Sequence, residues 1–217
     1  MTKFFFGKVI DVLKQKPLKL WGLSLLATLL TSLAYTFGVL PIISVPIALV
    51  LSAGMSLIYL KGYVGNESES RDIFRGFDDF KRVAGGMLWM ELWIFIWGLI
   101  PVVGPVFAVI KSYEYKFTPY ILMTEPEISA MDALKESQRR TDGHKGQMFA
   151  CEILLVVAVY LVFILLGLLS TIRYIGILFG IILILFLLCV IAFGPVVYGL
   201  LGAAFYLETP NLPKKER

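Results

Sequence analysis

Residues 97–110 read WGLIPVVGPVFAVI, and the prolines and glycines in this stretch decide how the chain folds. Proline and glycine interrupt helices and favour turns. Two topologies are open. In the first, Pro101–Pro105 is a tight turn and Val106–Thr124 returns alongside the segment before it. In the second, one long helix continues to about Ile110, and Lys111–Lys116 lie beyond its end.

The composition indicates a membrane protein. Of the 217 residues, 58% are apolar and 17% are charged, whereas soluble domains average about 45–50% and about 25%. The net charge of +4 is carried by short basic clusters between long uncharged runs, so we expect a lipid bilayer and no nucleic acid as the partner. The first uncharged run, Leu20–Leu60, is too long for a signal peptide and is expected to stay as an anchor.

The uncharged runs set the number of membrane spans. As one helix, Leu20–Leu60 would be about 62 Å long, roughly twice the ~30 Å hydrocarbon core of a bilayer. A break near Gly38–Pro46 therefore predicts two spans, at about 20–39 and 43–62. Two further spans are predicted at about 147–170 and 176–206, joined by the short turn Thr171–Ile175.

The positive-inside rule decides between the two topologies of the central region. In the first, every Lys and Arg lies on the cytoplasmic side except Lys111 and Lys116, within the bilayer, and Arg173, outside. The second divides the basic residues almost evenly between the two sides. We therefore expect the first, with six spans and both termini in the cytoplasm.

Three cytoplasmic segments, 3–16, 70–82 and 129–141, show apolar residues at helical spacing on one side only. The last has Ser129 as its expected N-cap and ends at Gly143. We expect interfacial helices whose apolar stripes lie among the lipid headgroups. The stripes consist of Phe5, Phe6, Val9, Val12 and Leu13, then Ile73, Phe74, Phe77 and Phe80, then Met131 and Leu134.

Each of these helices precedes a hairpin, which suggests an internal repeat. The expected fold is an all-α integral membrane protein with six transmembrane helices as three hairpins, each preceded by a cytoplasmic interfacial amphipathic helix. The repeat-like units are 1–63, 68–124 and 128–207 within one membrane domain, and 208–217 is a cytoplasmic tail. The alternative is that loops between hairpins are amphipathic without being repeats.

Charged groups inside the bilayer mark the candidate polar site, because each costs about 2.5–3.5 kcal/mol on insertion scales. The fourth span, Val106–Thr124, is polar on two sides. Pro119 is expected to kink it and to free the carbonyl of Tyr115. The site could bind an ion, a proton or a headgroup; alternatively, its charges are structural ion pairs or snorkelling lysines. Its predicted members are Lys111, Glu114, Tyr115, Lys116, Thr118, Tyr120, Glu91 and Glu152.

A second set of residues is predicted to contact anionic lipid headgroups. His144 and Lys145 lie at the expected N-terminus of the fifth span, where a helix attracts phosphate. Arg139 and Arg140 precede them on the last amphipathic helix. The alternative for the histidine is a merely solvated turn.

Several sequence motifs are missing. The chain has no G-x-S-x-G, no Walker A loop and no H-E-x-x-H, and it has a single histidine. Cys151 and Cys189 lie in apolar runs without acidic or histidine neighbours at metal spacing. We therefore expect no enzymatic activity, no cofactor and no metal site.

The segments KSYEYKFTPYIL (111–122), Glu125-Pro126, ALKES (133–137) and Gly143-His144-Lys145 resemble a bacterial family of integral membrane proteins, domain-of-unknown-function family 975. Phe74-Arg75-Gly76-Phe77 is similar to that family's F-x-G-F element. The resemblance covers about residues 70–150 and implies a multi-pass protein of the bacterial cytoplasmic (inner) membrane. In the family, small polar residues more often stand where this chain has Glu114 and Lys116, and the Pro-Gly turn is displaced here to Gly104-Pro105.

Two functions are compatible with these features. The first is a non-enzymatic small-solute transporter, or an accessory to one, with a buried polar site on the kinked fourth helix. The alternative is a scaffold whose cytoplasmic helices bind anionic lipid or a partner, such as another membrane protein or an exporter subunit. A water-accessible cavity reaching Lys111 would favour transport, and a dry bundle would favour the scaffold.

Overall fold

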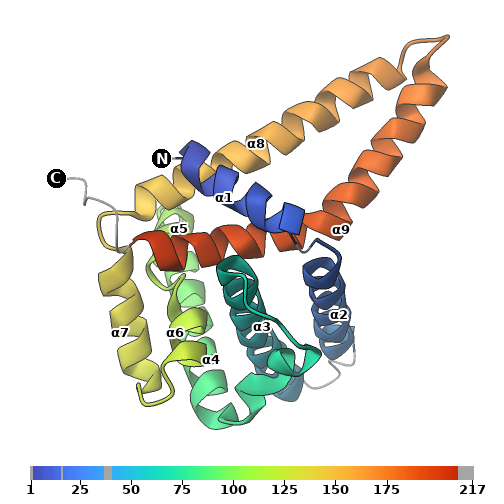
Figure 1. Ribbon diagram of the computed structural model, residues 1–217. Helices are drawn as coiled ribbons and strands as arrows, with labels where there is room; N and C mark the ends of the chain where they lie inside the picture. The colour runs from blue at the N-terminus through green and yellow to red at the C-terminus, as the bar shows by residue number, and fades with distance from the viewer. Residues whose placement is uncertain (1, 16, 37–40, 210–217) are drawn as a thin grey trace.

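The computed structural model describes residues 2–15, 17–36 and 41–209 (Figure 1). Within these ranges the chain is almost entirely helical and has no strand. The elements are α1 (Thr2–Gln15), α2 (Pro17–Thr36), α3 (Pro41–Val64), the 3₁₀ helix η1 (Ser70–Phe77), α4 (Phe80–Gly98), α5 (Gly104–Glu114), α6 (Thr118–Thr124), α7 (Ala130–Thr141), α8 (Lys145–Ser170) and α9 (Gly176–Glu208). The expected break at residues 38–46 lies partly outside the described residues.

Three helices are long and apolar enough to cross a membrane: α8, α9 and the Ile43–Val64 part of α3. The most apolar stretch of α8 has 0% of its residues buried, and that of α9 has 6%. Apolar surface of this extent marks contact with a membrane or another apolar partner. The chain is therefore an all-helical protein with three candidate membrane-spanning helices.

The core lies between α3 and the C-terminal half of α9. Helix α3 packs against α2, α4, α6, α9 and η1, and Leu200–Tyr206 of α9 are all buried. Helix α9 changes direction along its length (Figure 1), and it contains Pro195, which supplies no N–H to the preceding turn. The bend lets one part of α9 run beside α8 while the other crosses the core.

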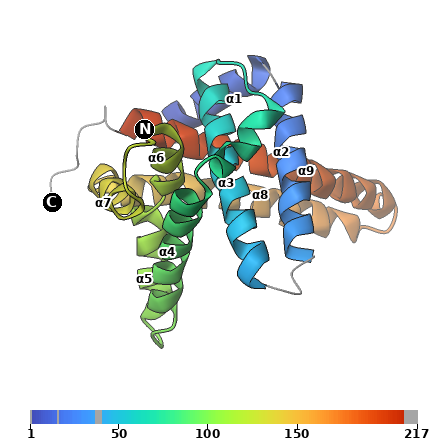
Figure 2. The same ribbon diagram turned by 90° about the horizontal axis from the view of Figure 1, so that it is seen from below.

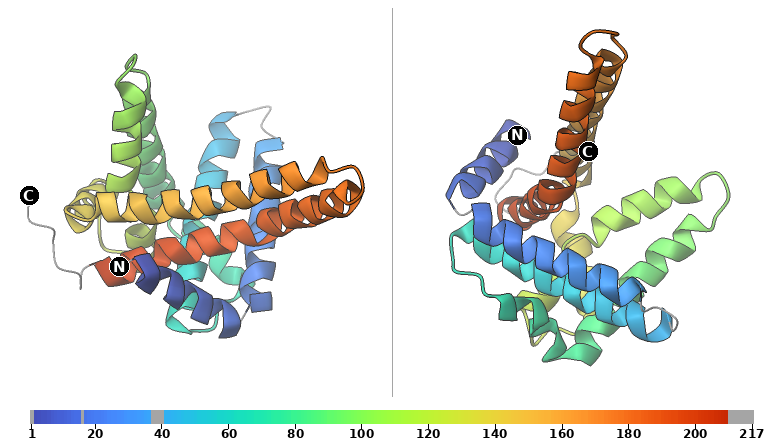
Figure 3. Two further views of the ribbon diagram at one scale, coloured as in Figure 1. Left: turned by 90° about the horizontal axis from the view of Figure 1, so that it is seen from above. Right: turned by 90° about the vertical axis from the view of Figure 1, so that its right-hand side faces the viewer.

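Three pairs of consecutive helices lie side by side: α2 with α3, α4 with α5, and α8 with α9. The first two pairs extend from the core in similar directions, whereas α8 and α9 extend in a different one (Figures 2 and 3). Helix α1 crosses α9, and the ring centroids of Phe5 and Phe205 are 4.8 Å apart in an edge-to-face contact.

The proline-rich stretch forms a tight turn, and α5 runs back beside α4. The turn satisfies its own backbone, because the N–H of Val103 donates to Pro101 O at 2.8 Å and that of Gly104 donates to Ile100 O at 2.9 Å. At its tip, Val102 has a φ of 69° and is 92% exposed. Gly104 is required for space, since a Cβ built there would lie 2.6 Å from Trp97 O.

The three amphipathic segments differ in outcome. The helix expected at 129–141 is confirmed as α7, where Ser129 Oγ accepts from the N–H of Asp132 at 3.1 Å and Gly143 has a φ of +83°. The helix expected at 70–82 is wrong: η1 is a short 3₁₀ helix, and α4 already begins at Phe80. The cause is close packing, because Gly76 approaches α3 so closely that a Cβ would meet a Val50 methyl at 2.8 Å.

The apolar stripes also need correction. The stripe of α1 does not face lipid headgroups, because Phe5 and Val9 are buried against the protein. In the third stripe, Met131 is exposed, whereas Leu134 is buried against the protein and does not face lipid headgroups. The stripe of the second segment is outward-facing at Phe74, Phe77 and Phe80, which are all exposed.

We predict that Gly104→Ala destabilises the protein, because the added methyl overlaps a backbone carbonyl that cannot move without opening the turn. Overpacking of this kind lowers the free energy of unfolding by about 1–3 kcal/mol. The control is Gly98→Ala in the same helix pair, whose Cβ would meet only Ala108 Cβ at 3.7 Å. Thermal unfolding in detergent should show a lower midpoint for Gly104→Ala alone; equal midpoints would contradict the role of the turn.

Candidate functional site

The segment after α5 is broken rather than kinked. Helix α5 ends at Glu114, residues 115–117 form a turn, and α6 begins at Thr118 with Pro119 in its first turn, where proline is tolerated. The carbonyl of Tyr115, expected to be free, accepts from the N–H of Thr118 at 2.9 Å. The expected kink at Pro119 is therefore wrong, because the chain leaves the helix before the proline is reached.

Ser137 of α7 connects the two sides of this break. Its hydroxyl donates to Glu114 O at 2.8 Å and accepts from the N–H of Phe117 at 3.1 Å. Thr141 Oγ1 lies 3.3 Å from the same Glu114 carbonyl. Both hydroxyl residues are fully buried. Helix α7 thus supplies the hydrogen bonds that a continuous helix would have made for itself, as the backbone requires where water is excluded.

The protein encloses the segment Tyr113–Tyr120. Four of these eight residues are buried and the other four are partly buried. Thr118 is completely buried, and its Oγ1 has no hydrogen-bond partner among the described residues. Tyr120 stacks on Tyr206 with ring centroids 5.1 Å apart and donates to Gly199 O at 3.4 Å.

Glu114 is the centre of the first charge cluster. Its carboxylate accepts from Lys111 Nζ at 2.6 Å and from Lys145 Nζ at 2.8 Å. Gln138 Nε2 adds a third contact at 3.3 Å. Two ammonium groups thus share one carboxylate, which joins α5 to the start of α8. Lys111 also lies 5.9 Å from the ring centroid of Tyr115, close enough for a cation–π contact.

Glu152 of α8 is the centre of the second charge cluster. It forms an ion pair with Lys116 and accepts a hydrogen bond from Tyr113 OH at 2.6 Å. Tyr198 of α9 lies 3.2 Å from Lys116 Nζ through its hydroxyl. The Lys116 ammonium is also over the rings of Tyr113 and Tyr198, at 4.9 and 5.0 Å from their centroids. Charge pairing and ring contacts together compensate for the removal of these groups from water.

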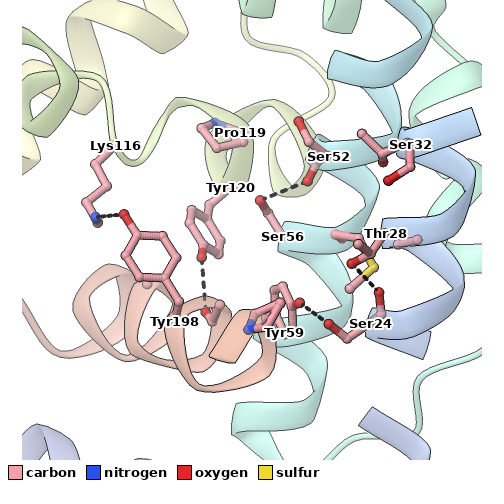
Figure 4. A pocket seen from close by; sticks show the side chains of 16 residues that line it. Ser24, Thr28, Ser32, Ser52, Ser56, Tyr59, Lys116, Pro119, Tyr120 and Tyr198 are labelled. Carbon is pink, nitrogen blue, oxygen red and sulfur yellow. Dashed lines mark hydrogen bonds between the residues drawn. The ribbon is translucent and has the colours of Figure 1, made fainter. Parts of the chain in front are cut away.

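A cavity of about 540 Å³ extends from Lys116 along α2 and α3 (Figure 4). We call it the hydroxyl groove, because nine of the sixteen residues that line it carry a hydroxyl group. Lys116 is the charged residue at its end, and Ser24 Oγ and Tyr59 OH are hydrogen-bonded at 2.8 Å across the α2–α3 contact. The hydroxyl-bearing residues of its wall are Ser24, Thr28, Thr31, Ser32, Ser52, Ser56, Tyr59, Tyr120 and Tyr198.

Sequence reasoning missed this groove, although a signal was present. Ser24, Thr28 and Thr31 are spaced four and three residues apart, and Ser52, Ser56 and Tyr59 repeat that spacing on the next helix. Residues at this spacing lie on one face of a helix. Two hydroxyl faces on consecutive apolar helices predict a polar surface between them.

The predicted site residues separate into different locations. Lys116 and Tyr120 line the hydroxyl groove, Lys111 and Glu114 belong to the first cluster, and Glu152 belongs to the second. Glu91 is exposed on α4, and no ion pair of Glu91 occurs within the described ranges. The carboxylate beside Lys116 is thus that of Glu152, not that of Glu91.

The predicted headgroup residues are mostly engaged within the protein. His144 is buried, with Nδ1 3.4 Å from Gln147 Oε1, so the expected exposed contact is wrong for this residue. Arg140 bridges Glu136, Glu125 at 2.8 Å and Tyr206 OH at 3.0 Å. Arg139 pairs with Glu136 but keeps 75% of its side chain exposed.

Comparison with protein-family models, curated proteins and solved structures found no match for this chain. In the described part of the chain, no three His, Cys, Asp or Glu side chains are grouped as metal ligands would be.

We predict that protonation of Glu136 loosens α7. Hydrogen bonds from Arg139 and Arg140 lower the pKa of this carboxyl to about 2 from its usual 4.5, against partial burial, which raises it. Because the folded-state pKa is the lower one, the stabilisation is complete above about pH 4.5 and is lost as the pH falls toward 2. From pH 6 to 3, the melting temperature of the native protein should fall about 2–4 °C further than that of Glu136→Gln, as for a loss of ~1 kcal/mol.

The control is Glu67→Gln, which removes an exposed carboxylate from the loop after α3 and should reproduce the native pH dependence. Identical pH profiles for native protein and Glu136→Gln would contradict the stabilising role of the Glu136 ion pairs.

Proposed function

We propose that this chain is a non-enzymatic multi-pass membrane protein that binds a small polar solute in the hydroxyl groove and transports it or assists a transporter. The observation that supports this most is the groove itself. Its hydroxyl-rich wall is formed by α2, α3, α6 and α9, helices that are otherwise apolar. Polar groups collected within apolar helices mark solute and ion pathways.

Because the groove has no net charge, it favours an uncharged solute. Its one cation, Lys116, is already paired with Glu152, so the two groups together bring no net charge to attract an ion. The remaining wall offers hydroxyl donors and acceptors together with the rings of Tyr59, Tyr120 and Tyr198. Such a surface suits a small solute rich in hydroxyl or amide groups.

The proposed topology has six spans as three hairpins, with both termini in the cytoplasm. Support comes from the side-by-side pairs of helices and from the basic residues, which gather at one end of each pair under this topology. In it, α5, the turn at 115–117 and α6 together form the fourth span. Discontinuous helices of this kind occur in transporters where the break is enclosed by protein or lines a cavity.

The proposed setting is the bacterial cytoplasmic membrane, and the proposed family is domain-of-unknown-function family 975. This rests on the sequence resemblance. The resembling segment includes the helix break, at Tyr115 and Thr118, and two residues that line the groove, Pro119 and Tyr120. A family element concerned with solute binding would be expected at such a place.

A scaffold function is the second candidate, and one observation favours it. Phe74, Phe77 and Phe80 form an exposed row, with the rings of Phe77 and Phe80 stacked at 5.8 Å. Exposed aromatic rows insert at membrane–water interfaces or contact partner proteins. In this case the intramembrane polar residues would serve only to hold the helices together.

Hydration of the groove distinguishes the two functions. In a background without Cys151 and Cys189, we predict that Ser56→Cys reacts rapidly with a small polar methanethiosulfonate in detergent-free vesicles. The control, Val157→Cys, lies on the outward surface of α8 and should react at least tenfold more slowly, because lipid covers it. Equally slow reaction at both positions would show a dry groove and would favour the scaffold.

Solute passage is tested with glycerol, erythritol and urea as uncharged probes. We predict that proteoliposomes admit at least one probe faster than empty liposomes, and that Ser56→Leu returns entry to the empty rate by filling the groove. Ser112→Leu, on the exposed side of α5, should leave entry unchanged. No probe entering faster than in empty liposomes, or unchanged entry in Ser56→Leu, would contradict transport through this groove.

A further inference from the structure

A second groove, which the proposed solute pathway does not use, lies between α5 and α8. Its volume is about 540 Å³, and its wall is almost wholly apolar. Val106, Val109 and Ile110 form the α5 side, and Phe149 forms part of the α8 side. We call it the apolar groove. From Pro105 to Tyr113, which it also contacts, it follows α5 for about 12 Å, at 1.5 Å per residue.

The apolar groove opens onto the outward surface of the protein. Val106 is 61% exposed and Phe149 is 46% exposed, although both line the groove. The most apolar stretch of α8 has none of its residues buried in the protein. A molecule that enters the groove sideways would therefore come from the hydrocarbon region of the membrane.

A positively charged cluster lies beside one end of the apolar groove. Lys145 lines the groove and shares Glu114 with Lys111. Two ammonium groups against one carboxylate leave the first charge cluster with a net charge of +1. The side chains of Lys111 and Lys145 keep 22% and 29% of their surface exposed. Lys145 lines the groove with its apolar stem, and its ammonium group lies beside the groove on Glu114. The wall beside Gly146 also leaves space, since a Cβ there would meet nothing within 4 Å.

We propose that the apolar groove binds an anionic phospholipid, with one acyl chain between α5 and α8 and the phosphate beside Lys145. An apolar channel that faces the hydrocarbon and ends at a net positive charge matches an amphiphile with an anionic headgroup. Basic pockets between helices at the cytoplasmic boundary bind anionic headgroups in this way. A soluble phosphate compound would match only the charged end.

Lipid retention tests this proposal. The full-length protein is reconstituted in nanodiscs of phosphatidylglycerol and phosphatidylcholine at a 1:4 ratio, extracted into mild detergent, and analysed for bound lipid by native mass spectrometry. Native protein should retain phosphatidylglycerol at least fivefold above its share of the bilayer. Retention in proportion to the bilayer would overturn the proposal, because it would show only unspecific surface lipid.

Two matched pairs of variants locate the lipid. Gly146→Leu fills the apolar groove and should abolish the preference, whereas Gly167→Leu, also on α8 with open space at its Cβ, should retain it. Lys145→Gln should lower the ratio of phosphatidylglycerol to phosphatidylcholine toward that of the bilayer, whereas Lys135→Gln, which alters an exposed lysine of α7, should not. Equal effects within either pair would contradict the assignment.

Two further measurements complete the test: the unfolding temperatures of the variants and a competition with inorganic phosphate. A side chain added at position 146 extends into open space, and Glu114 keeps Lys111 as a partner in Lys145→Gln. Both Gly146→Leu and Lys145→Gln should therefore unfold near the native temperature. Excess inorganic phosphate should leave the bound phosphatidylglycerol in place. Displacement by phosphate would show a site for the anion alone and would overturn the placement of the acyl chain. Neither result depends on whether the hydroxyl groove transports a solute.

Discussion

A charged side chain in an apolar environment is stable only if an opposite charge and hydrogen bonds accompany it, and this constraint determines how the segment after the Pro101–Pro105 turn is held. Lys111 and Glu114 lie on α5 after this turn, and Lys116 lies in the break that follows α5. Each has a partner of opposite charge, either within α5 or on α8. Removal of Glu152 would leave an unpaired ammonium among aromatic rings. The pairs thus fix α5 and the break against α8.

The second charge cluster lies between the two grooves and connects them. Lys116 lines the hydroxyl groove, Tyr113 lines the apolar groove, and Glu152 contacts both side chains. A bound lipid that displaced Tyr113 would therefore alter the partner set of Lys116. Helix α7 stabilises the same region from the other side through Ser137. The helix break is thus surrounded by groups that satisfy it, which explains how a non-helical turn persists amid apolar helices.

Helix positions could be predicted from the sequence because apolar periodicity, uncharged length and turn residues are local signals. The ends of α7 and the turn after Ile100 follow directly from Ser129, Gly143, Pro101 and Gly104. The pairing of Lys116 with Glu152 could not be predicted, since Glu91 was equally plausible without knowledge of how α4 and α8 pack. The break before Pro119 also depends on a distant partner, Ser137. Burial of the apolar stripe of α1 depends on its contact with α9, which is nearly 200 residues away. The hydroxyl groove could have been predicted from the sequence, because the serine, threonine and tyrosine residues that line it recur at helical spacing on α2 and α3.

The most direct test of this account is the location of α7 relative to the turn at Val102. In cells expressing the protein without its two native cysteines, a membrane-impermeant maleimide is applied to Val102→Cys and, separately, to Lys135→Cys, two exposed positions. If the chain returns through the bilayer after the turn, Val102→Cys is labelled in intact cells and Lys135→Cys only after permeabilisation. Labelling of Lys135→Cys in intact cells would show that the segment does not return, and would contradict the account.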